Sequence, residues 1–171
     1  ELLNATITTL TNSSKAIISL KDSSQVLVDG NDVYYSSNYK KVENVRFDAF
    51  TWNYFMLFPY KLNDPGTIWS DQSSQELNGT NYNFQTLTFE ANTGDAPDDW
   101  YKVYSDQKTN LVKAAAYIVT AGITKEEAEK DPHAIEYTNY IDVDSIPLAT
   151  TWTFFGWQKD KGLTDKLGYA T

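Results

Sequence analysis

The sequence predicts a mainly β protein of the α+β class, built around a curved antiparallel sheet. The central segment Trp100–Thr120 consists of two long strand-like runs around a polar turn at Asp106–Asn110. Further strand–turn–strand units lie on both sides of it, and only two short segments show helical spacing of apolar residues. Chains of this kind form meandering hairpins that pair with their sequence neighbours.

Composition limits the classes of function that are possible. The 171 residues predict one domain, and the 41% hydrophobic content is typical of a globular protein. A net charge of −9 argues against binding to nucleic acids or to anionic lipid headgroups. The absence of cysteine excludes disulfides and thiolate chemistry. No run approaches the roughly 18 apolar residues of a membrane-spanning helix.

The first part of the chain predicts two hairpins. Leu2–Leu10 pairs with Lys15–Leu20 around a TNSS turn, and Gln25–Val28 pairs with Val33–Ser36. The second turn contains Asp29-Gly30, a strong hairpin signal because glycine adopts positive φ at little cost. Because the chain opens abruptly on a strand, we expect that a segment before it has been removed. Asn-x-Ser/Thr sequons occur at Asn4, Asn12 and Asn78.

An aromatic segment follows, and its spacing predicts a short helix that Pro59 ends. Its aromatic residues lie on one helical face; they are Phe47, Phe50, Tyr54, Phe55 and Phe58. Two interpretations are open: the helix plugs the concave side of the sheet, or it is a movable lid over a groove of lipid size.

After a loop at Lys61–Thr67, the strands Ile68–Leu77 and Asn81–Glu90 are predicted, with Asn78-Gly79 between them. The second strand changes phase, because Tyr82 and Phe84 have one parity while Leu87 and Phe89 have the other. A β-bulge at Gln85–Thr86 would explain the change, since one extra residue switches the faces of a strand.

The acidic loop Thr93–Asp99 contains the cluster that most resembles a ligand set, Asp95, Asp98 and Asp99. Clustered carboxylates bind Ca²⁺, but this spacing is not that of an EF-hand. We therefore expect these residues to serve turn geometry rather than a metal. A metal-dependent enzyme that uses residues 93–99 stays open as an alternative.

The strand Leu111–Thr120 has apolar residues at nearly all of both its odd and its even positions, so it is expected to be covered on both faces.

Thr124 and Glu127 form a capping box that opens a helix lasting to about Lys130. His133, the only histidine, is expected in a loop. Without partners for a triad or a metal site, no catalytic residue, cofactor or metal is predicted.

The last part of the chain predicts two strands and a tail. Ile135–Val143 alternates, with Ile135, Tyr137, Ile141 and Val143 expected inward. Ser145–Leu148 is expected to be a turn, and Ala149–Gln158 a strand with aromatic residues on both faces. The tail from Lys159 is polar and rich in glycine, and is interpreted as a loop leading to a strand that the chain lacks.

Several segments together resemble a known family. GDAPDDWYKVYSDQKTNLVKAAAYIVT, IEYTNYIDVDSIPLATTWTFFGW and FPYKLNDPG resemble an uncharacterised lipoprotein family of Bacteroidetes, over roughly residues 46–168. That family is similar in architecture to the LolA/LolB lipoprotein-carrier superfamily. The resemblance implies an open half-barrel of antiparallel strands curled around short helices, with lipid in the apolar concavity. It also implies a location in the cell envelope, in the periplasm or anchored to the outer membrane.

The expected function is therefore non-catalytic binding of a lipid or acyl chain in the concave face of a single domain. The predicted lining consists of Phe47, Phe50, Tyr54, Phe55, Tyr117, Trp152 and Phe154. A structural or interaction protein whose concavity is plugged by its own helix is the main alternative. The resemblance carries over no catalytic residues, and the chain departs from it by lacking the usual beginning and the last strand.

Overall fold

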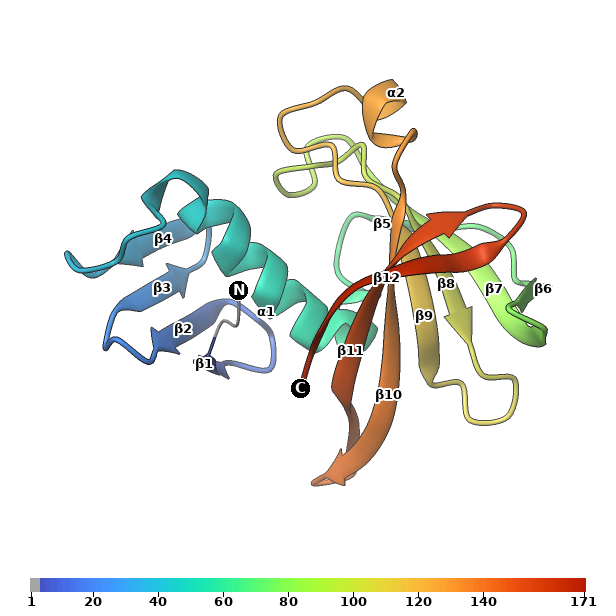
Figure 1. Ribbon diagram of the computed structural model, residues 1–171, viewed down its shortest axis with the longest axis horizontal. Helices are drawn as coiled ribbons and strands as arrows, with labels where there is room; N and C mark the ends of the chain where they lie inside the picture. Colours follow the sequence, from blue (N-terminus) through green and yellow to red (C-terminus); the bar gives the residue numbers. More distant parts are fainter. Residues whose placement is uncertain (1–3) are drawn as a thin grey trace. The chain divides into compact units, whose positions relative to one another are not determined.

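The computed structural model describes residues 4–171. The chain divides into two compact units, Glu1–Leu62 and Asn63–Thr171. Each unit has its own antiparallel sheet (Figure 1). The dominance of antiparallel strands, with only a few helical segments, confirms the predicted fold class. Leu2 and Leu3, which belong to the first predicted strand, lie outside the described residues. The expectation of a single domain stays a prediction.

The first unit is a four-stranded sheet followed by a helix. The strands β1 (Ala5–Thr9), β2 (Lys15–Leu20), β3 (Gln25–Asp29) and β4 (Asp32–Tyr35) pair in chain order. Ala16, Ile18, Val26 and Val28 alternate with exposed residues and form the core of this unit. The predicted hairpins are confirmed, and Gly30 has the positive φ, +61°, that its turn requires.

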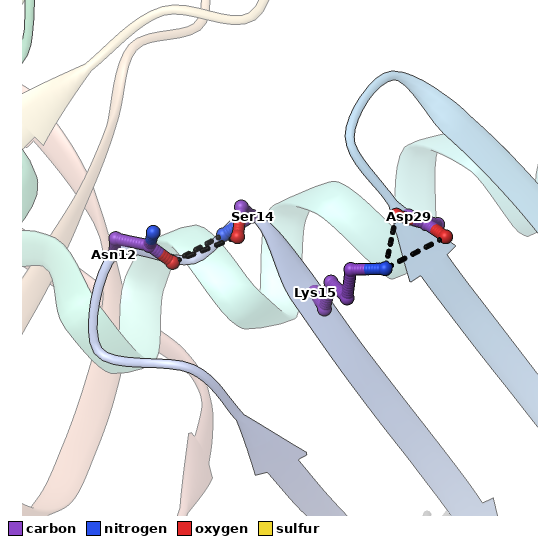
Figure 2. Close-up of polar contacts among 4 residues, drawn as sticks. All are labelled: Asn12, Ser14, Lys15 and Asp29. Carbon is purple, nitrogen blue, oxygen red and sulfur yellow. Dashed lines mark hydrogen bonds and ion pairs between the residues drawn. The ribbon is translucent and has the colours of Figure 1, made fainter.

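Side chains at the ends of β2 and β3 fix the local geometry (Figure 2). In the β1–β2 turn, Asn12 Oδ1 accepts hydrogen bonds from the backbone N of Ser14 at 3.1 Å and from its Oγ at 2.8 Å. Opposite each other on the paired strands, Lys15 Nζ and Asp29 Oδ1 lie 3.0 Å apart. The ion pair is exposed and contributes little to stability, but its position matches the register of the strands.

A single turn, η1 (Val42–Asn44), leads into the helix α1 (Val45–Lys61). The prediction that Pro59 ends this helix is wrong, because α1 continues for two residues beyond it. Proline lacks the N–H that would bond to the carbonyl four residues earlier. In the last turn this removes one hydrogen bond, and the helix ends at Lys61, with Leu62 as its C-cap.

The second unit is an eight-stranded antiparallel sheet. Its first strands are β5 (Thr67–Trp69), β6 (Ser73–Leu77), β7 (Thr80–Phe89) and β8 (Tyr101–Ser105). Then follow β9 (Val112–Tyr117), the short helix α2 (Lys125–Ala128), β10 (His133–Val143), β11 (Ile146–Gln158) and β12 (Gly162–Ala170). The order is β12-β11-β10-β9-β8-β7-β5, with β6 also paired to β7, so the sheet is open rather than closed on itself.

The phase change in β7 does not come from a bulge, and that prediction is wrong. The pairing of β7 with β8 runs without a shift from Asn83 to Leu87. Instead, β7 has apolar neighbours on one face in its first half and on the other face in its second half. Tyr82 and Phe84 pack with Leu77 and Tyr104, whereas Phe89 contacts Tyr101. The irregularity lies in the neighbouring segment, which the sequence suggested as one strand and which divides into β5 and β6.

The strand β9 is covered on both faces, as predicted. Ala114, Ala115 and Ala116 are each 0% exposed. The capping box of α2 is also confirmed, because Thr124 accepts a bond from the N–H of Glu127 and the Glu127 side chain accepts one from Thr124.

The end of the chain differs from its prediction in four respects. His133 begins β10 rather than lying in a loop, and β11 resumes at Ile146, directly after a two-residue turn. The polar tail folds into β12, which pairs with β11. Ile141 and Val143 are exposed rather than buried, because β10 pairs with β9 only over residues 133–136. Beyond that point the hairpin extends past β9, so sequence alternation there does not produce burial.

No helix within residues 4–171 is long and apolar enough to cross a membrane.

Candidate ligand-binding face

The strand registers divide the side chains of the eight-stranded sheet between two faces. Residues directly opposite each other on neighbouring antiparallel strands lie on the same face. Leu87, Tyr101, Tyr117 and His133 form one such row across β7, β8, β9 and β10. The face that contains this row is rich in aromatic residues. We call it the aromatic face, and its rings are Trp69, Phe89, Tyr101, Tyr117, Tyr137, Trp152 and Phe154.

The rings of the aromatic face contact one another from strand to strand. Phe89 meets Tyr101 edge to face with centroids 6.1 Å apart, and Tyr101 lies 5.9 Å from Tyr117. The row continues to His133, 6.1 Å from Tyr117. Such pairs stabilise a sheet beyond the area that they bury. The arrangement therefore creates a continuous strip of rings that crosses four strands.

Burial is greatest at the middle strands of this face. Tyr101, Tyr117 and Tyr137 are buried, whereas Trp152 and Phe154 on β11 are half-buried. Burial raises the pKa of Tyr117 to about 12, so its hydroxyl stays protonated and uncharged at physiological pH. The uncharged, buried ring of Tyr117 suits contact with apolar groups.

Three of the predicted lining residues are brought together here. Tyr117, Trp152 and Phe154 share the aromatic face, and the Trp152 ring lies 6.4 Å from Tyr137. The prediction missed further members of the face, namely Trp69, Phe89, Tyr101 and Tyr137. Tyr101 and Tyr117 are both odd-numbered positions of the central hairpin, and this shared parity was the signal that could have identified Tyr101.

The other four predicted residues lie on α1, in the first unit. The helix contacts its own sheet through Val45, Ala49 and Phe50, so Phe50 contributes to that core. At 100° per residue, Tyr54 lies far around the helix from Ala49. Tyr54 contacts Phe58 edge to face, with centroids 5.6 Å apart. Phe55 is buried, whereas Phe47 is 45% exposed.

The opposite face of the eight-stranded sheet has its own apolar core. Trp100 and Trp157 meet edge to face at 6.0 Å, and they pack with Ala116, Ile118 and Ala134. Trp157, on the second parity of β11, therefore has a structural role in this core. Trp157 and Phe155 point away from the aromatic face, because their parity on β11 is opposite to that of Trp152 and Phe154.

The acidic loop is anchored through one carboxylate. Asp99 Oδ1 accepts hydrogen bonds from the backbone N of Thr120 at 2.7 Å and from its Oγ1 at 2.8 Å. Burial raises the pKa of Asp99, and the two bonds from Thr120 oppose this shift in part. The carboxylate thus joins the start of β8 to the segment after β9. In the part of the chain that is described, no three His, Cys, Asp or Glu side chains gather in a metal-binding group.

Comparison with known proteins adds evidence on the fold. No family model matches the sequence, and no match was found among the curated proteins. Among solved structures, the chain is similar to a LolA superfamily protein from Nitrosomonas europaea, with a TM-score of 0.57 and 11% sequence identity. The match covers 100% of this chain and 76% of the other. At this level of identity the likeness is one of fold, and the chain has a LolA-like fold.

Proposed function

We propose that this protein is a non-catalytic binding protein that holds an apolar ligand, such as a lipid or an acyl chain, against the aromatic face. The single observation that carries the proposal is the continuous strip of aromatic rings across β7, β8, β9 and β10. Burial of an acyl chain against such rings is non-directional and needs few polar groups.

The fold supports the same proposal. A LolA superfamily protein has a similar architecture. Separate segments of the sequence resemble an uncharacterised lipoprotein family of Bacteroidetes. We therefore propose a cell-envelope location and a lipidic ligand that Tyr117, Trp152 and Phe154 contact. Phe47, Phe50, Tyr54 and Phe55 lie on α1 in the first unit, and a role in ligand binding stays a separate prediction for them. Of these, Phe47 is the most exposed, and Phe50 is already engaged by the core of its own unit.

The test compares neighbouring residues of one strand that face opposite ways. Trp152 and Phe154 belong to the aromatic face, while Phe155 between Phe154 and Gly156 pairs with Ala134 on the other face. An environment-sensitive fatty-acid probe is expected to bind the wild type with micromolar affinity, about −8 kcal/mol. Trp152→Ala with Phe154→Ala should weaken this binding at least tenfold, whereas Phe155→Ala should leave it unchanged if the fold is kept.

A second candidate function is that of a structural or interaction protein whose concavity is filled by its own side chains. The burial of Tyr101, Tyr117 and Tyr137 favours it, because buried rings already have apolar neighbours. Native mass spectrometry of the purified protein distinguishes the two. Co-purified lipid supports the binding function, whereas a ligand-free protein that also binds no probe supports the plugged alternative.

A further inference from the structure

The turn between β6 and β7 contains the only Asn-Gly pair of the sequence, Asn78-Gly79. Leu77 pairs with Thr80 across this turn, and its two central residues have positive φ values of +49° and +85°. Positive φ at both positions is the mark of a type I′ turn, for which Asn-Gly is a preferred pair. The same pair is chemically labile, because no side chain on glycine shields the backbone nitrogen that follows the asparagine.

The backbone of this turn is open to solvent. Asn78, Gly79 and Thr80 are exposed, and a Cβ placed on Gly79 would meet no atom within 4 Å. Within residues 4–171, no acceptor takes a hydrogen bond from the N–H of Gly79. The Gly79 nitrogen is therefore accessible to hydroxide, which must remove its proton before this nitrogen can act as a nucleophile.

The side chain of Asn78, by contrast, is held by the first residues of β12, which lies close to this turn in the second unit (Figure 1). Its amide oxygen accepts from the N–H of Leu163, and its amide nitrogen donates to the Leu163 carbonyl. Gly162 leaves the space for this contact, since a Cβ on it would lie 2.6 Å from Asn78 Oδ1. The two bonds fix both the direction and the plane of the side-chain amide.

We propose that Asn78 is a deamidation site whose rate is set by the opening of its two hydrogen bonds to Leu163. Once they open, the deprotonated Gly79 nitrogen attacks Asn78 Cγ, the Cγ–Nδ2 bond breaks, and Nδ2 leaves as ammonia with a proton from water. Water then opens the succinimide to aspartate or isoaspartate. The balance is one amide and one water to one carboxylic acid and one ammonia, so no oxidant or reductant is needed.

The reaction changes the contact with β12 irreversibly. Aspartate keeps an acceptor for the Leu163 N–H, but it places a negatively charged oxygen opposite the Leu163 carbonyl oxygen in place of the Nδ2 donor. Isoaspartate also lengthens the backbone of a two-residue turn by one carbon. Either product should loosen the start of β12. The inference does not rest on the proposed ligand binding, because neither Asn78 nor Leu163 belongs to the aromatic face.

Peptide mapping by mass spectrometry tests the proposal on wild-type protein kept at mildly alkaline pH, either folded or in urea. In urea, Asn78 should deamidate severalfold faster than Asn12 and Asn92, neither of which precedes glycine. In the folded protein, Asn78 should deamidate severalfold more slowly than it does in urea, because the reaction requires local opening. Equal rates at Asn78 in the two conditions would overturn the proposal.

A pair of variants separates the contact with Leu163 from the rest of the fold. Gly162→Ala displaces Asn78 Oδ1 without altering the Asn-Gly pair, and it should raise the rate at Asn78 in the folded protein. Gly122→Ala is the matched control, because Gly122 also has a positive φ, +83°, and a Cβ there meets no atom within 4 Å. Circular dichroism verifies that both variants fold. A folded Gly162→Ala protein with the wild-type rate would contradict the role of the two bonds.

Hydrogen exchange measures the consequence for β12 and does not depend on the glycine variants. Asn78→Asp imitates the aspartate product, and the amides at the start of β12 should exchange severalfold faster in it than in the wild type. Asn92→Asp adds the same charge at another exposed turn and should leave the exchange of β12 unchanged. Equal protection of β12 in the two variants would show that deamidation at Asn78 does not loosen this strand.

Discussion

Asn78 and Leu163 are joined by two reciprocal hydrogen bonds across 85 positions of the chain. Asn78 Oδ1 accepts from the backbone N of Leu163 at 2.9 Å, and its Nδ2 donates to the Leu163 carbonyl oxygen at 3.2 Å. The amide of one side chain thereby imitates a β-ladder partner. It connects the β6–β7 turn to the beginning of β12, two places that share no strand pairing in the sheet order.

Asn78→Gly is expected to lower the free energy of unfolding by about 1–3 kcal/mol, since both bonds are lost and the backbone groups of Leu163 lose their partner. Glycine keeps the positive φ of this turn position, +49°, so backbone strain does not enter the result. Asn92→Gly is the matched control, because Asn92 is exposed and has a φ of +68°. Urea denaturation measures both variants, and equal effects would contradict the role of the Asn78 side chain.

Asp99→Asn should be at least as stable as the wild type at pH 7. The difference in stability between the variant and the wild type should become smaller as the pH falls. The folded-state pKa of Asp99 is raised above its ordinary value of 3.8, chiefly by burial. The folded wild type therefore binds a proton more readily than the unfolded chain, and it gains stability as the pH falls from the raised pKa towards 3.8. Asparagine does not titrate but keeps an oxygen for Thr120. Melting temperatures between pH 3 and pH 7 give the comparison.

Asp106→Asn should show the opposite dependence on pH. The folded-state pKa of Asp106 is lowered because its carboxylate accepts bonds from the N–H groups of Thr109 and Lys108 and from Thr109 Oγ1. This stabilisation is present above 3.8 and is lost as the pH falls through the lowered pKa. The variant should therefore be less stable than the wild type at pH 7 and equal to it in strong acid. A difference that grows on acidification would refute this account.

Ser145→Gly should stabilise the protein by about 0.5 kcal/mol, the net of relieved backbone strain and the greater entropy of glycine in the unfolded chain. Asp144 and Ser145 join β10 to β11 with φ values of +51° and +67°. Positive φ at both central residues is the mark of a type I′ hairpin turn, which favours glycine at its second central position. Ser145→Val should have the opposite effect, because a β-branched side chain is unfavourable at positive φ. Thermal unfolding of both variants tests the pair.

Ile135→Ala and Ile141→Ala should differ sharply in cost, although both residues belong to β10. Ile135 is 0% exposed, and its loss should cost about 2–5 kcal/mol. Ile141 is 51% exposed, and its replacement should change stability by less than about 1 kcal/mol. Chemical denaturation of the two variants tests the comparison, and similar costs would mean that the end of the hairpin is covered in solution.

Local chemistry explains why most of the strands could be predicted. Gly30, the Asn78-Gly79 pair and Asn110 occupy turns in which the backbone adopts positive φ, and these signals depend on near neighbours alone. The burial of the residues on each face of a strand could not be predicted in the same way, because burial depends on which other strands lie beside it. Ile141 and Ile135 look alike in the sequence, yet β9 reaches only one of them.

The residues of the candidate site also differ in whether near neighbours in the sequence or pairing between strands identifies them. Tyr117, Trp152 and Phe154 were identified from their aromatic character, and the registers of β9, β10 and β11 place them on one face. Tyr137 was expected inward but not as a member of the site, because its proximity to Trp152 follows from a cross-strand pair.

The sheet order also has a consequence for how the second unit folds. From β7 to β12 each strand pairs with its successor along the chain, so every step can be made by closing a short or moderate loop. Proteins rich in such contacts of low sequence separation fold comparatively fast. The contact between Asn78 and Leu163 is of a different kind, because it closes a loop of 85 positions and gains from strands that are already in place. Its contribution is therefore expected mainly in slower unfolding of the completed sheet.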